Sequence, residues 1–436
     1  MLNYFYDTES YISERIKLYN RIKSGDTELK IKKYIKKFES INDIKLNETQ
    51  KNAVMGSIIN NFFIITGGPG TGKTTIIKAI VDYYKDKNSI ALLAPTGRSA
   101  KRMSESVKVN ASTIHKFLKW DRESSTFGLN EYNKSKAKIV IVDESSMIDI
   151  FLFSSLLRAL NDTVKLILVG DANQLPSIGP GNILYDLLSD EKINKEYLNF
   201  IYRTDEKSYI NVLAEQIKNK ELIEYSNDYN DFKFIESSDD NIINNLKFIC
   251  EKIKEKNISL DEFQVLVPMY KGSVGIDNIN KTLQDIFNPN YNDLEEITYS
   301  STIFRENDKI LQLVNDVDNN VFNGDIGYIE KVITYPKKNI IVNFSGNRVS
   351  YEQEDFDKIT LSYAMSIHKS QGSEYDNVVV VIASSHKRMF YNKLIYTAVT
   401  RAKKNLIILG KLDNFNYSIN SNYSLKRVTY LNKLLK

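Results

Sequence analysis

The sequence contains few of the residues that build cross-links and metal centres. Among its 436 residues there are one cysteine, Cys250, and three histidines, His115, His368 and His386. A single cysteine excludes an internal disulfide, and histidines so widely scattered exclude a zinc site made of Cys and His. We therefore expect an intracellular, cytoplasmic protein.

Long apolar runs are missing as well. The longest, Val378–Ala383, is far shorter than the roughly 18 apolar residues of a membrane helix. Met1–Ser10 lacks the basic start and apolar core of a signal peptide, so we expect no membrane association. The excess of charge is also small, because 59 Lys and Arg against 55 Asp and Glu give +4, too little to indicate a polyanionic partner by itself.

The composition that is present is globular. Hydrophobic residues make up 42% and charged residues 26%, which excludes disordered and collagen-like chains. A chain of 436 residues is expected to form two or more hydrophobic cores. Cys250 lies in an apolar helical stretch, residues 242–253, and is therefore predicted to be a core residue rather than a reactive thiol.

Continuous apolar segments alternate with helical ones after Lys45. They are too uniform for half-exposed strands and are typical of parallel sheets that are covered on both faces. In the first half they are Phe62–Thr66, Ile90–Ala94, Lys138–Val142 and Val164–Val169, with a connecting helix predicted over Thr74–Tyr84. In the second half they are Phe263–Val267, Asn377–Ala383 and Asn405–Leu409. The sequence thus predicts an α/β fold with two sheets.

Two insertions interrupt this pattern. Thr298–Lys358 has short alternating segments separated by Asn-Gly and Ser-Gly turns, which predicts a small β-barrel in the second half. Trp120–Tyr132 predicts a β-hairpin in the first half, with Phe127 and Gly128 near its tip. Before the first sheet, residues 11–41 hold two amphipathic helical patterns, and the second, rich in lysine, favours a solvated face over DNA contact.

A phosphate-binding loop follows the first strand. Residues 67–74, GGPGTGKT, match G-x-x-x-x-G-K-[ST] between a strand and a helix. In such a loop the glycines let backbone N–H groups point at phosphate oxygens, and the helix N-terminus adds its positive dipole end. Lys73 is expected to reach the β- and γ-phosphates of ATP, and the Thr74 hydroxyl to ligate Mg²⁺.

Polar residues follow two further strands. Asp143 and Glu144 come after Lys138–Val142, where we expect an adjacent parallel strand to meet the phosphate loop. Asp143 would hold Mg²⁺ through water, and Glu144 would polarise the attacking water. Gln174 follows Val164–Val169 and could sense the γ-phosphate without adding charge. Open α/β sheets bind ligands at the carboxyl ends of their strands, so these expectations are mutually consistent.

The second half contains no phosphate loop, which predicts one ATP between two halves. It offers arginines instead, Arg203 in a Tyr-Arg pair and Arg401 in the segment Tyr396–Lys403. Guanidinium groups delivered from the second half would stabilise charge on the transferring phosphoryl group, and hydrolysis would release them. Such a cycle predicts a motor in which ATP turnover in the cleft opens and closes two domains.

Nine segments, in order, resemble the motor motifs of the RecD-like helicases of superfamily 1B. They are Thr66–Thr75, Ala94–Ala100, Ser112–His115, Val142–Met147, Gly170–Asn182, Pro268–Gly272, Phe322–Asp325, His368–Glu374 and Tyr396–Lys403. The resemblance extends from about Leu46 to Gly410. Because the glutamine motif begins at Leu46, the sequence resembles a short form of these enzymes. This form lacks the large N-terminal region, with helix-hairpin-helix elements, of the longer RecD-like enzymes.

The resemblance implies two RecA-like P-loop NTPase domains in tandem, with a strand-separating hairpin in the first and a Src-homology-3-like β-barrel in the second. The implied parts are an N-terminal helical segment (1–44), motor domain 1 (45–195, hairpin at about 117–134), motor domain 2 (196–297 and 359–436) and the barrel (298–358). The barrel would lie over the DNA.

The resemblance also implies roles for individual residues. At the nucleotide, Gln50 would read adenine, Tyr202 would stack on adenine, and Glu374 would contact the ribose. The other ATP-binding residues would be Gly68, Pro69, Gly70, Thr71, Gly72, Lys73, Thr74, Thr75 and Gly372. Arg203 and Arg401 would be the γ-phosphate arginines. Single-stranded DNA would be contacted by Thr96, Arg98, Thr113, His115, Tyr270, Lys271, Asn323, Ser366, His368 and Gln371, and strands would be separated by Trp120 and Phe127. Such contacts are independent of base sequence.

The function expected from these features is that of an ATP- and Mg²⁺-dependent DNA helicase. It would move on single-stranded DNA as a monomer and unwind duplex at junctions, with a 5′→3′ direction that rests on the resemblance alone. Two alternatives stay open. One is an RNA-directed superfamily 1 helicase, and the other is a nucleotide-gated switch that grips nucleic acid without unwinding it.

Overall fold

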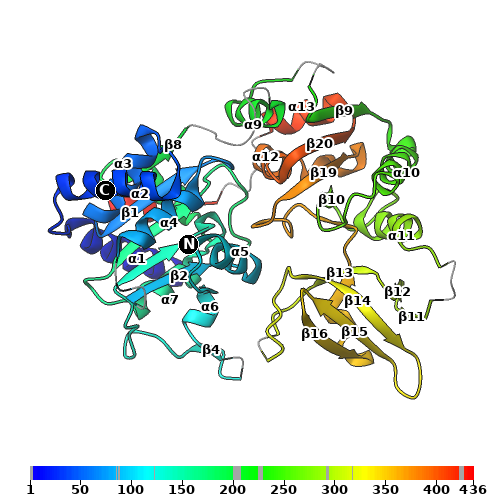
Figure 1. Ribbon diagram of the computed structural model, residues 1–436, viewed down its shortest axis with the longest axis horizontal. Helices are drawn as coiled ribbons and strands as arrows, with labels where there is room; N and C mark the ends of the chain where they lie inside the picture. Colours follow the sequence, from blue (N-terminus) through cyan, green and yellow to red (C-terminus); the bar gives the residue numbers. More distant parts are fainter. Residues whose placement is uncertain are drawn as a thin grey trace. The chain divides into compact units, whose positions relative to one another are not determined.

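The computed structural model describes residues 3–84, 86, 89–121, 123–199, 208–223, 229–290, 294–316, 318–421 and 427–436. The chain forms two compact units, which we call unit 1 (Met1–Arg203 and Leu425–Lys436) and unit 2 (Thr204–Ser424) (Figure 1). It therefore passes from unit 1 to unit 2 once and then returns to unit 1. Among the helices of the described residues, none has both the length and the apolar character required to cross a membrane.

Unit 1 is built on a parallel sheet. Its strands, in spatial order, are β3 (Ala111–Thr113), β2 (Ile90–Ala94), β6 (Ile139–Val142), β7 (Lys165–Gly170), β1 (Phe62–Gly67) and β8 (Lys195–Leu198). The predicted strands are confirmed, but one expectation about their order is wrong. The strand that precedes Asp143, β6, is not adjacent to β1, because β7 lies between them.

Helices cover both faces of this sheet, as the uniformly apolar strands predict. Alternate residues of β1 point into two separate cores, Phe62 and Ile64 into one and Phe63 and Ile65 into the other. The helices of unit 1 are α1 (Asn3–Arg21), α2 (Glu28–Asn42), α3 (Glu48–Ile59), α4 (Lys73–Tyr83), α5 (Gly97–Val107), α6 (Ile114–Phe117), α7 (Ile150–Ala159), α8 (Ile183–Leu188) and α14 (Leu431–Leu435), with a 3₁₀ turn η2 (Ser145–Met147). Helix α2 buries Ile31, Ile35 and Phe38 and exposes its lysines, as expected.

The hairpin inserted in unit 1 is shorter than the sequence predicts. It consists of β4 (Trp120–Asp121) and β5 (Thr126–Phe127), and Trp120 pairs directly with Phe127. Phe127 therefore lies at the base of the hairpin, and its expected place near the tip is wrong. The predicted hairpin continues to Tyr132, but residues 128–133 bend away from the strand pair, and Asn130 Nδ2 donates to the Phe127 carbonyl (3.1 Å).

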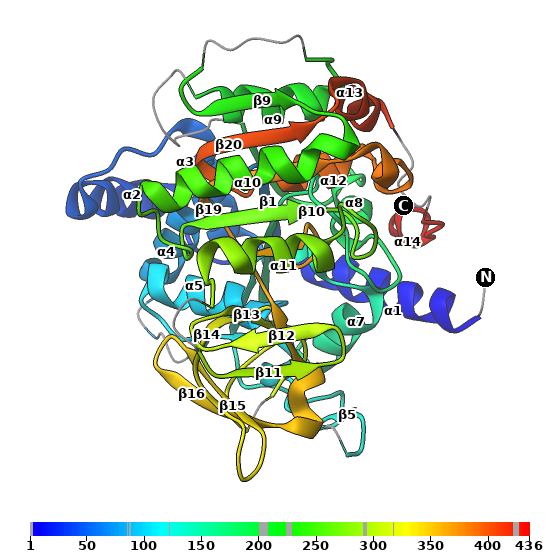
Figure 2. The ribbon, with the colours of Figure 1, turned by 90° about the vertical axis from the view of Figure 1, so that its right-hand side faces the viewer.

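Unit 2 contains a second parallel sheet. Its strands, in spatial order, are β18 (Ala364–Ser366), β10 (Phe263–Val267), β19 (Tyr375–Ile382), β20 (Ala402–Gly410) and β9 (Phe232–Glu236). The helices are α9 (Tyr209–Asn219), α10 (Asp239–Glu255), α11 (Ile276–Phe287), α12 (Asn392–Val399) and α13 (Leu412–Asn420), with a 3₁₀ turn η4 (Ser384–Met389). Figure 2 shows α10 and α11 in front of this sheet. Cys250 of α10 is fully buried there, which confirms that it is a core residue.

An antiparallel sheet is inserted in unit 2. In spatial order it contains β16 (Asn347–Glu352), β15 (Asn339–Phe344), β14 (Ile326–Ile333), β13 (Lys309–Gln312) and β17 (Ile359–Leu361), with the 3₁₀ turn η3 (Gln353–Lys358) before β17. A two-stranded ribbon, β11 (Glu296–Tyr299) and β12 (Thr302–Arg305), precedes it. We call β11–β17 the barrel module.

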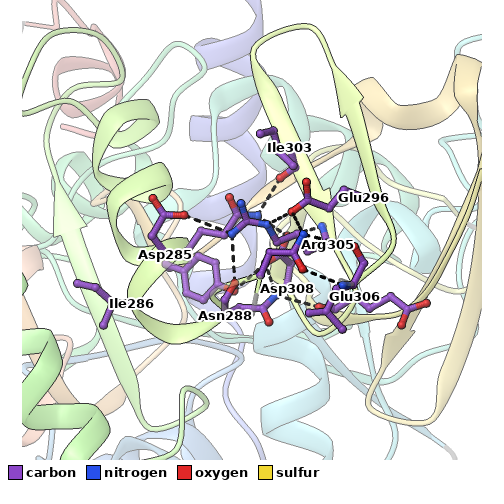
Figure 3. A network of polar contacts seen from close by, with 12 residues as sticks. Asp285, Ile286, Asn288, Glu296, Ile303, Arg305, Glu306 and Asp308 are labelled. Atoms are coloured by element: carbon purple, nitrogen blue, oxygen red, sulfur yellow. Dashed lines mark hydrogen bonds and ion pairs between the residues drawn. The ribbon is translucent and has the colours of Figure 1, made fainter. Parts of the chain in front are cut away.

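A buried polar network joins the barrel module to α11 (Figure 3). Its hub is the Asp308 carboxylate, which is fully buried and accepts hydrogen bonds from Gln284 Nε2 (2.6 Å), Asn288 Nδ2 (2.8 Å), the Arg305 backbone N–H (2.7 Å) and the Tyr363 hydroxyl (2.9 Å). A buried carboxylate is stable only when its oxygens are satisfied in this way. The network therefore fixes the start of β13 against α11 of unit 2.

Candidate functional site

The predicted motifs of unit 1 gather at one edge of its sheet. Parallel strands place all their carboxyl ends on the same side. At this edge β1 leads into the phosphate loop, β2 into Thr96 and Arg98, β3 into Thr113 and His115, β6 into Asp143 and Glu144, and β7 into Asp171–Gln174. Tyr202 and Arg203 follow β8 in the sequence but lie outside the described residues.

The phosphate loop is held in shape by its own contacts. Gly70 (φ 73°) and Gly72 (φ 87°) adopt left-handed conformations that let the backbone turn sharply before α4. The Lys73 ammonium donates to the Gly67 and Gly68 carbonyls (both 2.7 Å), and Thr71 Oγ1 donates to the Gly68 carbonyl (2.8 Å). Lys73 thus lies across the loop, at the N-terminus of α4, where an anion is favoured.

Gln50 lies against this loop from α3. Its Oε1 accepts from the Asn47 N–H (3.1 Å) and completes a capping box, while its Nε2 donates to the Thr71 carbonyl (3.1 Å). A Cβ at Gly72 would come within 2.3 Å of that Nε2, so glycine is needed for this approach as well. The glutamine supports the loop, and its predicted contact with adenine stays a prediction.

Asp143 and Glu144 stand at the end of β6. Asp143 Oδ1 accepts from the Glu144 N–H (2.8 Å), and Glu144 itself has a left-handed backbone (φ 51°). Ser145 Oγ donates to the Val169 carbonyl (2.8 Å), which ties the end of β6 to the end of β7. Because β7 pairs with both β6 and β1, one strand separates the strand that carries the carboxylates from the strand that leads into the loop.

Gln174 has an amide group with unused hydrogen-bonding capacity. The residue is 4% exposed, and its Nε2 makes a long contact with Asp171 Oδ2 (3.5 Å). Its Oε1 is buried and has no hydrogen-bond partner among the residues that the structure describes. A buried amide atom without a partner costs roughly 1–3 kcal/mol. The terminal torsion of glutamine is two-fold, so either end of the amide can turn to an incoming polar group.

His115, a predicted DNA contact, forms an aromatic cluster with the two residues predicted to separate strands. The ring centroid of Trp120 lies 4.8 Å from that of Phe127, and His115 lies 6.2 Å from Trp120. Burial lowers the pKa of His115, while the Asp149 carboxylate acts in the opposite direction. The histidine is therefore neutral near pH 7 and contributes a ring and hydrogen bonds rather than a charge. Trp120 is 40% exposed, which leaves part of its ring open to a ligand.

In unit 2 the predicted DNA residues follow two neighbouring strands. Val267 at the end of β10 pairs with Ser366 at the end of β18, so the loops after these strands start side by side. Tyr270 and Lys271, both exposed, come from the first loop, and His368 and Gln371 from the second. Lys369 Nζ donates to Asn323 Oδ1 (2.6 Å), which brings Asn323 of the barrel module to the same loops.

Arg401 is buried within unit 2, with 2% exposure. Its guanidinium donates to the Thr397 carbonyl (3.0 Å), to the Ser373 carbonyl (2.9 Å) and to Thr400 Oγ1 (3.2 Å). These bonds join the end of α12 to the segment that contains Gly372 and Glu374. The structure thus gives Arg401 an anchoring role in unit 2, and its contact with a phosphate stays a prediction.

One contact at the carboxyl edge of the unit 1 sheet could not be predicted from the sequence pattern. Arg427 donates to the loop that follows Gln174, although the two residues are far apart in the chain. It belongs to no motif and lies beyond the last predicted strand. Only the three-dimensional path of the chain, which returns to unit 1 after unit 2, brings it there.

Comparisons with known protein families cover the two units and the barrel module. Residues 50–180 match an AAA domain, residues 279–344 match the SH3 domain of ATP-dependent RecD-like DNA helicases, and residues 361–409 match a UvrD-like helicase C-terminal domain. The barrel predicted from the turn pattern is thereby confirmed as an SH3-like domain, here with an antiparallel sheet.

Curated relatives point the same way. The ATP-dependent RecD2 DNA helicase of Deinococcus radiodurans is 31% identical over 366 residues, which are 84% of this chain and 49% of that protein. The RecBCD enzyme subunit RecD of Buchnera aphidicola subsp. Acyrthosiphon pisum is 30% identical over an alignment of 470 positions, gaps included, which covers 89% of this chain and 76% of that protein. The chain thus spans about half the length of the Deinococcus relative and about three quarters of the Buchnera one.

Solved structures share the fold at lower identity. The Pif1 helicase from Bacteroides, in complex with ADP-AlF3 and single-stranded DNA, gives a TM-score of 0.53 at 18% identity and covers 88% of this chain and 96% of its own. The Pif1 helicase from Candida albicans gives 0.52 at 17% identity, with coverages of 87% and 97%. The chain therefore shares the fold of these Pif1 helicases. Its sequence relatives and its SH3 domain show that it belongs to the RecD-like helicase family.

Proposed function

We propose that the chain is an ATP-dependent helicase that moves on single-stranded DNA and unwinds duplex, in the 5′→3′ direction. The observation that supports this most strongly is the carboxyl edge of the unit 1 sheet. A phosphate loop, two carboxylates and a buried glutamine lie there on three strands, β1, β6 and β7. The Deinococcus relative is named an ATP-dependent DNA helicase, and a Pif1 neighbour holds single-stranded DNA.

The residues of this edge divide the work of ATP hydrolysis. Lys73, held across the loop at a helix N-terminus, provides positive charge for the β- and γ-phosphates. Glu144 is the residue that orients and polarises the attacking water, as a partly buried carboxylate can. Gln174 meets the γ-phosphate through its amide oxygen, which accepts no hydrogen bond from the described part of the chain. Arg203 and Arg401 are proposed to complete the charge stabilisation.

Magnesium would be held by the Thr74 hydroxyl and Asp143 together with phosphate oxygens. Thr74 is exposed on the first turn of α4 and Asp143 is partly buried, so both can reach a ligand. Among the described residues no cluster of three or more His, Cys, Asp or Glu could hold a metal alone. Such a sparse set fits Mg²⁺, which usually keeps water and substrate phosphates as ligands. When bound, the ion would neutralise charge on the phosphates.

The proposed single-strand contacts come from both units. In unit 1 they are Thr96, Arg98, Thr113 and His115, and in unit 2 they are Tyr270, Lys271, Asn323, Ser366, His368 and Gln371. Burial lowers the pKa of both His115 and His368, so these residues offer hydrogen bonds and stacking rather than charge. Because most of these groups suit phosphate and sugar, binding is expected to be independent of base sequence.

The test is ATP hydrolysis by the purified full chain, with and without single-stranded DNA. We expect strong stimulation by DNA, and little hydrolysis by Lys73→Ala at the same protein concentration. The matched control is Lys51→Ala, which removes a partly buried lysine of the neighbouring helix α3. Wild-type protein that hydrolyses ATP no faster with DNA would favour the gated binding switch, and stronger stimulation by RNA than by DNA would favour the RNA helicase.

A further inference from the structure

Residues 427–436, which we call the return segment, are an integral part of unit 1. Leu431 and Leu435 of α14 are buried in the same core as α1 and the β1 strand, and α14 packs against α1 and α8 (Figure 2). The segment is also anchored by hydrogen bonds. The Tyr430 N–H donates to Glu9 Oε2 (2.8 Å), and Ser13 Oγ donates to the Leu434 carbonyl (2.9 Å).

At the start of the return segment, Arg427 binds the loop that follows Gln174. Its Nη1 donates to the Gly179 carbonyl (2.5 Å), to the Gly181 carbonyl (2.7 Å) and to Ser177 Oγ (3.1 Å). Its Nη2 donates to the Ser177 carbonyl. One guanidinium thus collects four acceptors within five consecutive residues. Planar forks of this kind fix orientation as well as distance.

The opposite side of this loop packs on the start of α7. The Ile150 N–H donates to the Pro180 carbonyl (3.0 Å). A Cβ at Gly179 would come within 2.4 Å of an Asp149 carboxylate oxygen, and one at Gly181 within 2.1 Å of Ile150 Cγ2. The loop is therefore clamped between α7 and Arg427. Because it continues directly from Gln174 through the buried Leu175, its position sets the position of the glutamine.

We propose that Arg427 is a positioning residue for ATP hydrolysis, which acts through the Ser177–Gly181 loop to hold Gln174 at the carboxyl edge of the sheet. This inference rests on the proposed function, since Gln174 matters to catalysis only if the edge hydrolyses ATP. Arg427 itself touches loop carbonyls and a hydroxyl, so it would influence the rate of turnover while the phosphate loop and its affinity for ATP stay as they are.

The test compares Arg427→Ala with wild type in DNA-stimulated ATP hydrolysis. Misplacing a catalytic group by about 1 Å can cost up to ~100-fold in rate, and we expect kcat to fall about 10-fold with KM for ATP little changed. In the Gln174→Ala background the same substitution should cost almost nothing, because residues that act as a unit are non-additive. The matched control is Ser13→Ala, which loosens the return segment without touching the loop and should leave kcat unchanged.

Two results would overturn the inference. One is an Arg427→Ala variant with wild-type kcat, and the other is an equal loss of kcat with and without Gln174, which indicates a purely structural role. If Arg427→Ala does not fold, Arg427→Lys takes its place, since an ammonium keeps charge but not the planar fork. A lowered kcat at unchanged thermal midpoint then supports the inference, and wild-type kcat contradicts it.

Hydrogen exchange separates failure of this inference from failure of the proposed function. If wild-type protein shows no DNA-stimulated hydrolysis, the proposed function fails by itself. Amides of residues 174–182 should still exchange faster in Arg427→Ala than in wild type, because the loop has lost its clamp. Unchanged exchange there would contradict the clamp whatever the enzyme does.

Discussion

Removing the Asp308 carboxylate tests how the barrel module is fixed in unit 2. In Asp308→Ala four donors lose their hydrogen bond to this carboxylate, but two of them keep a second acceptor. Gln284 Nε2 keeps the Ile303 carbonyl (2.8 Å) and Asn288 Nδ2 keeps the Glu306 carbonyl (2.8 Å). The Arg305 backbone N–H and the Tyr363 hydroxyl lose the acceptor that Asp308 provides.

Each buried donor left without an acceptor costs roughly 1–3 kcal/mol, so two of them cost about 2–6 kcal/mol. A partial offset comes from the carboxylate itself, because burial raises the pKa of Asp308 despite its hydrogen bonds. The free energy of unfolding of unit 2 should therefore fall by about 2–4 kcal/mol. Asp308→Asn keeps one acceptor oxygen and should lose less.

The assay is urea denaturation followed by circular dichroism, with hydrogen exchange of residues 302–312 to identify the transition of unit 2. Asp285→Ala is the matched control. Its carboxylate contacts Arg305 Nη1 (3.3 Å) in the same network (Figure 3) but is 72% exposed, so its loss should cost no more than about 1 kcal/mol. An Asp308→Ala variant as stable as this control would refute the account of the network.

Four further predictions follow from other groups. Burial raises the pKa of Asp186 to about 6, so the folded state favours the protonated acid and the free energy of unfolding falls as the pH rises from about 4 to 6. Asp186→Asn should therefore be more stable than wild type at pH 8, by on the order of 2 kcal/mol, and no more stable at pH 4. An equal difference in stability at the two pH values would contradict this. Lys73→Ala should abolish ATP turnover with an unchanged circular dichroism spectrum, and normal turnover would rule out the assigned site. Burial raises the pKa of Cys250, so a thiol reagent should label it only after denaturation; rapid labelling of native protein would show the thiol to be exposed. Trp120→Ala should impair strand displacement more than DNA-stimulated ATP hydrolysis, and equal losses in both would refute the strand-separating assignment.

Much of the fold was predictable because its signals are local. Uniform apolar strands, a glycine-rich loop before a helix and turn pairs between short alternating segments each depend on neighbouring residues. The predicted bounds of β2 and β10 agree with the structure for this reason. The order of strands in the sheet does not depend on neighbours, and the expectation that β6 lies beside β1 was accordingly wrong.

Part of the site was predictable because parallel strands place their carboxyl ends at the same edge of a sheet. That rule brought Lys73, Asp143 and Gln174 to one edge without any contact being known. It could not reveal the supporting bonds made by Arg427 or by Asp308, because these join segments far apart in the chain through atoms with no sequence pattern. The length of the hairpin was also overestimated, because its predicted range runs to Tyr132 while the strand pairing extends only to Trp120 and Phe127.

Strand displacement on tailed duplex DNA tests the central claim most directly. The full chain, ATP and Mg²⁺ would be mixed with duplexes that carry a single-stranded tail at either the 5′ or the 3′ end, with Lys73→Ala as the inactive control. The account predicts ATP-dependent release of the displaced strand from the 5′-tailed duplex. Release from the 3′-tailed duplex alone would contradict the direction, and no release from either, despite DNA-stimulated ATP hydrolysis, would contradict the helicase assignment.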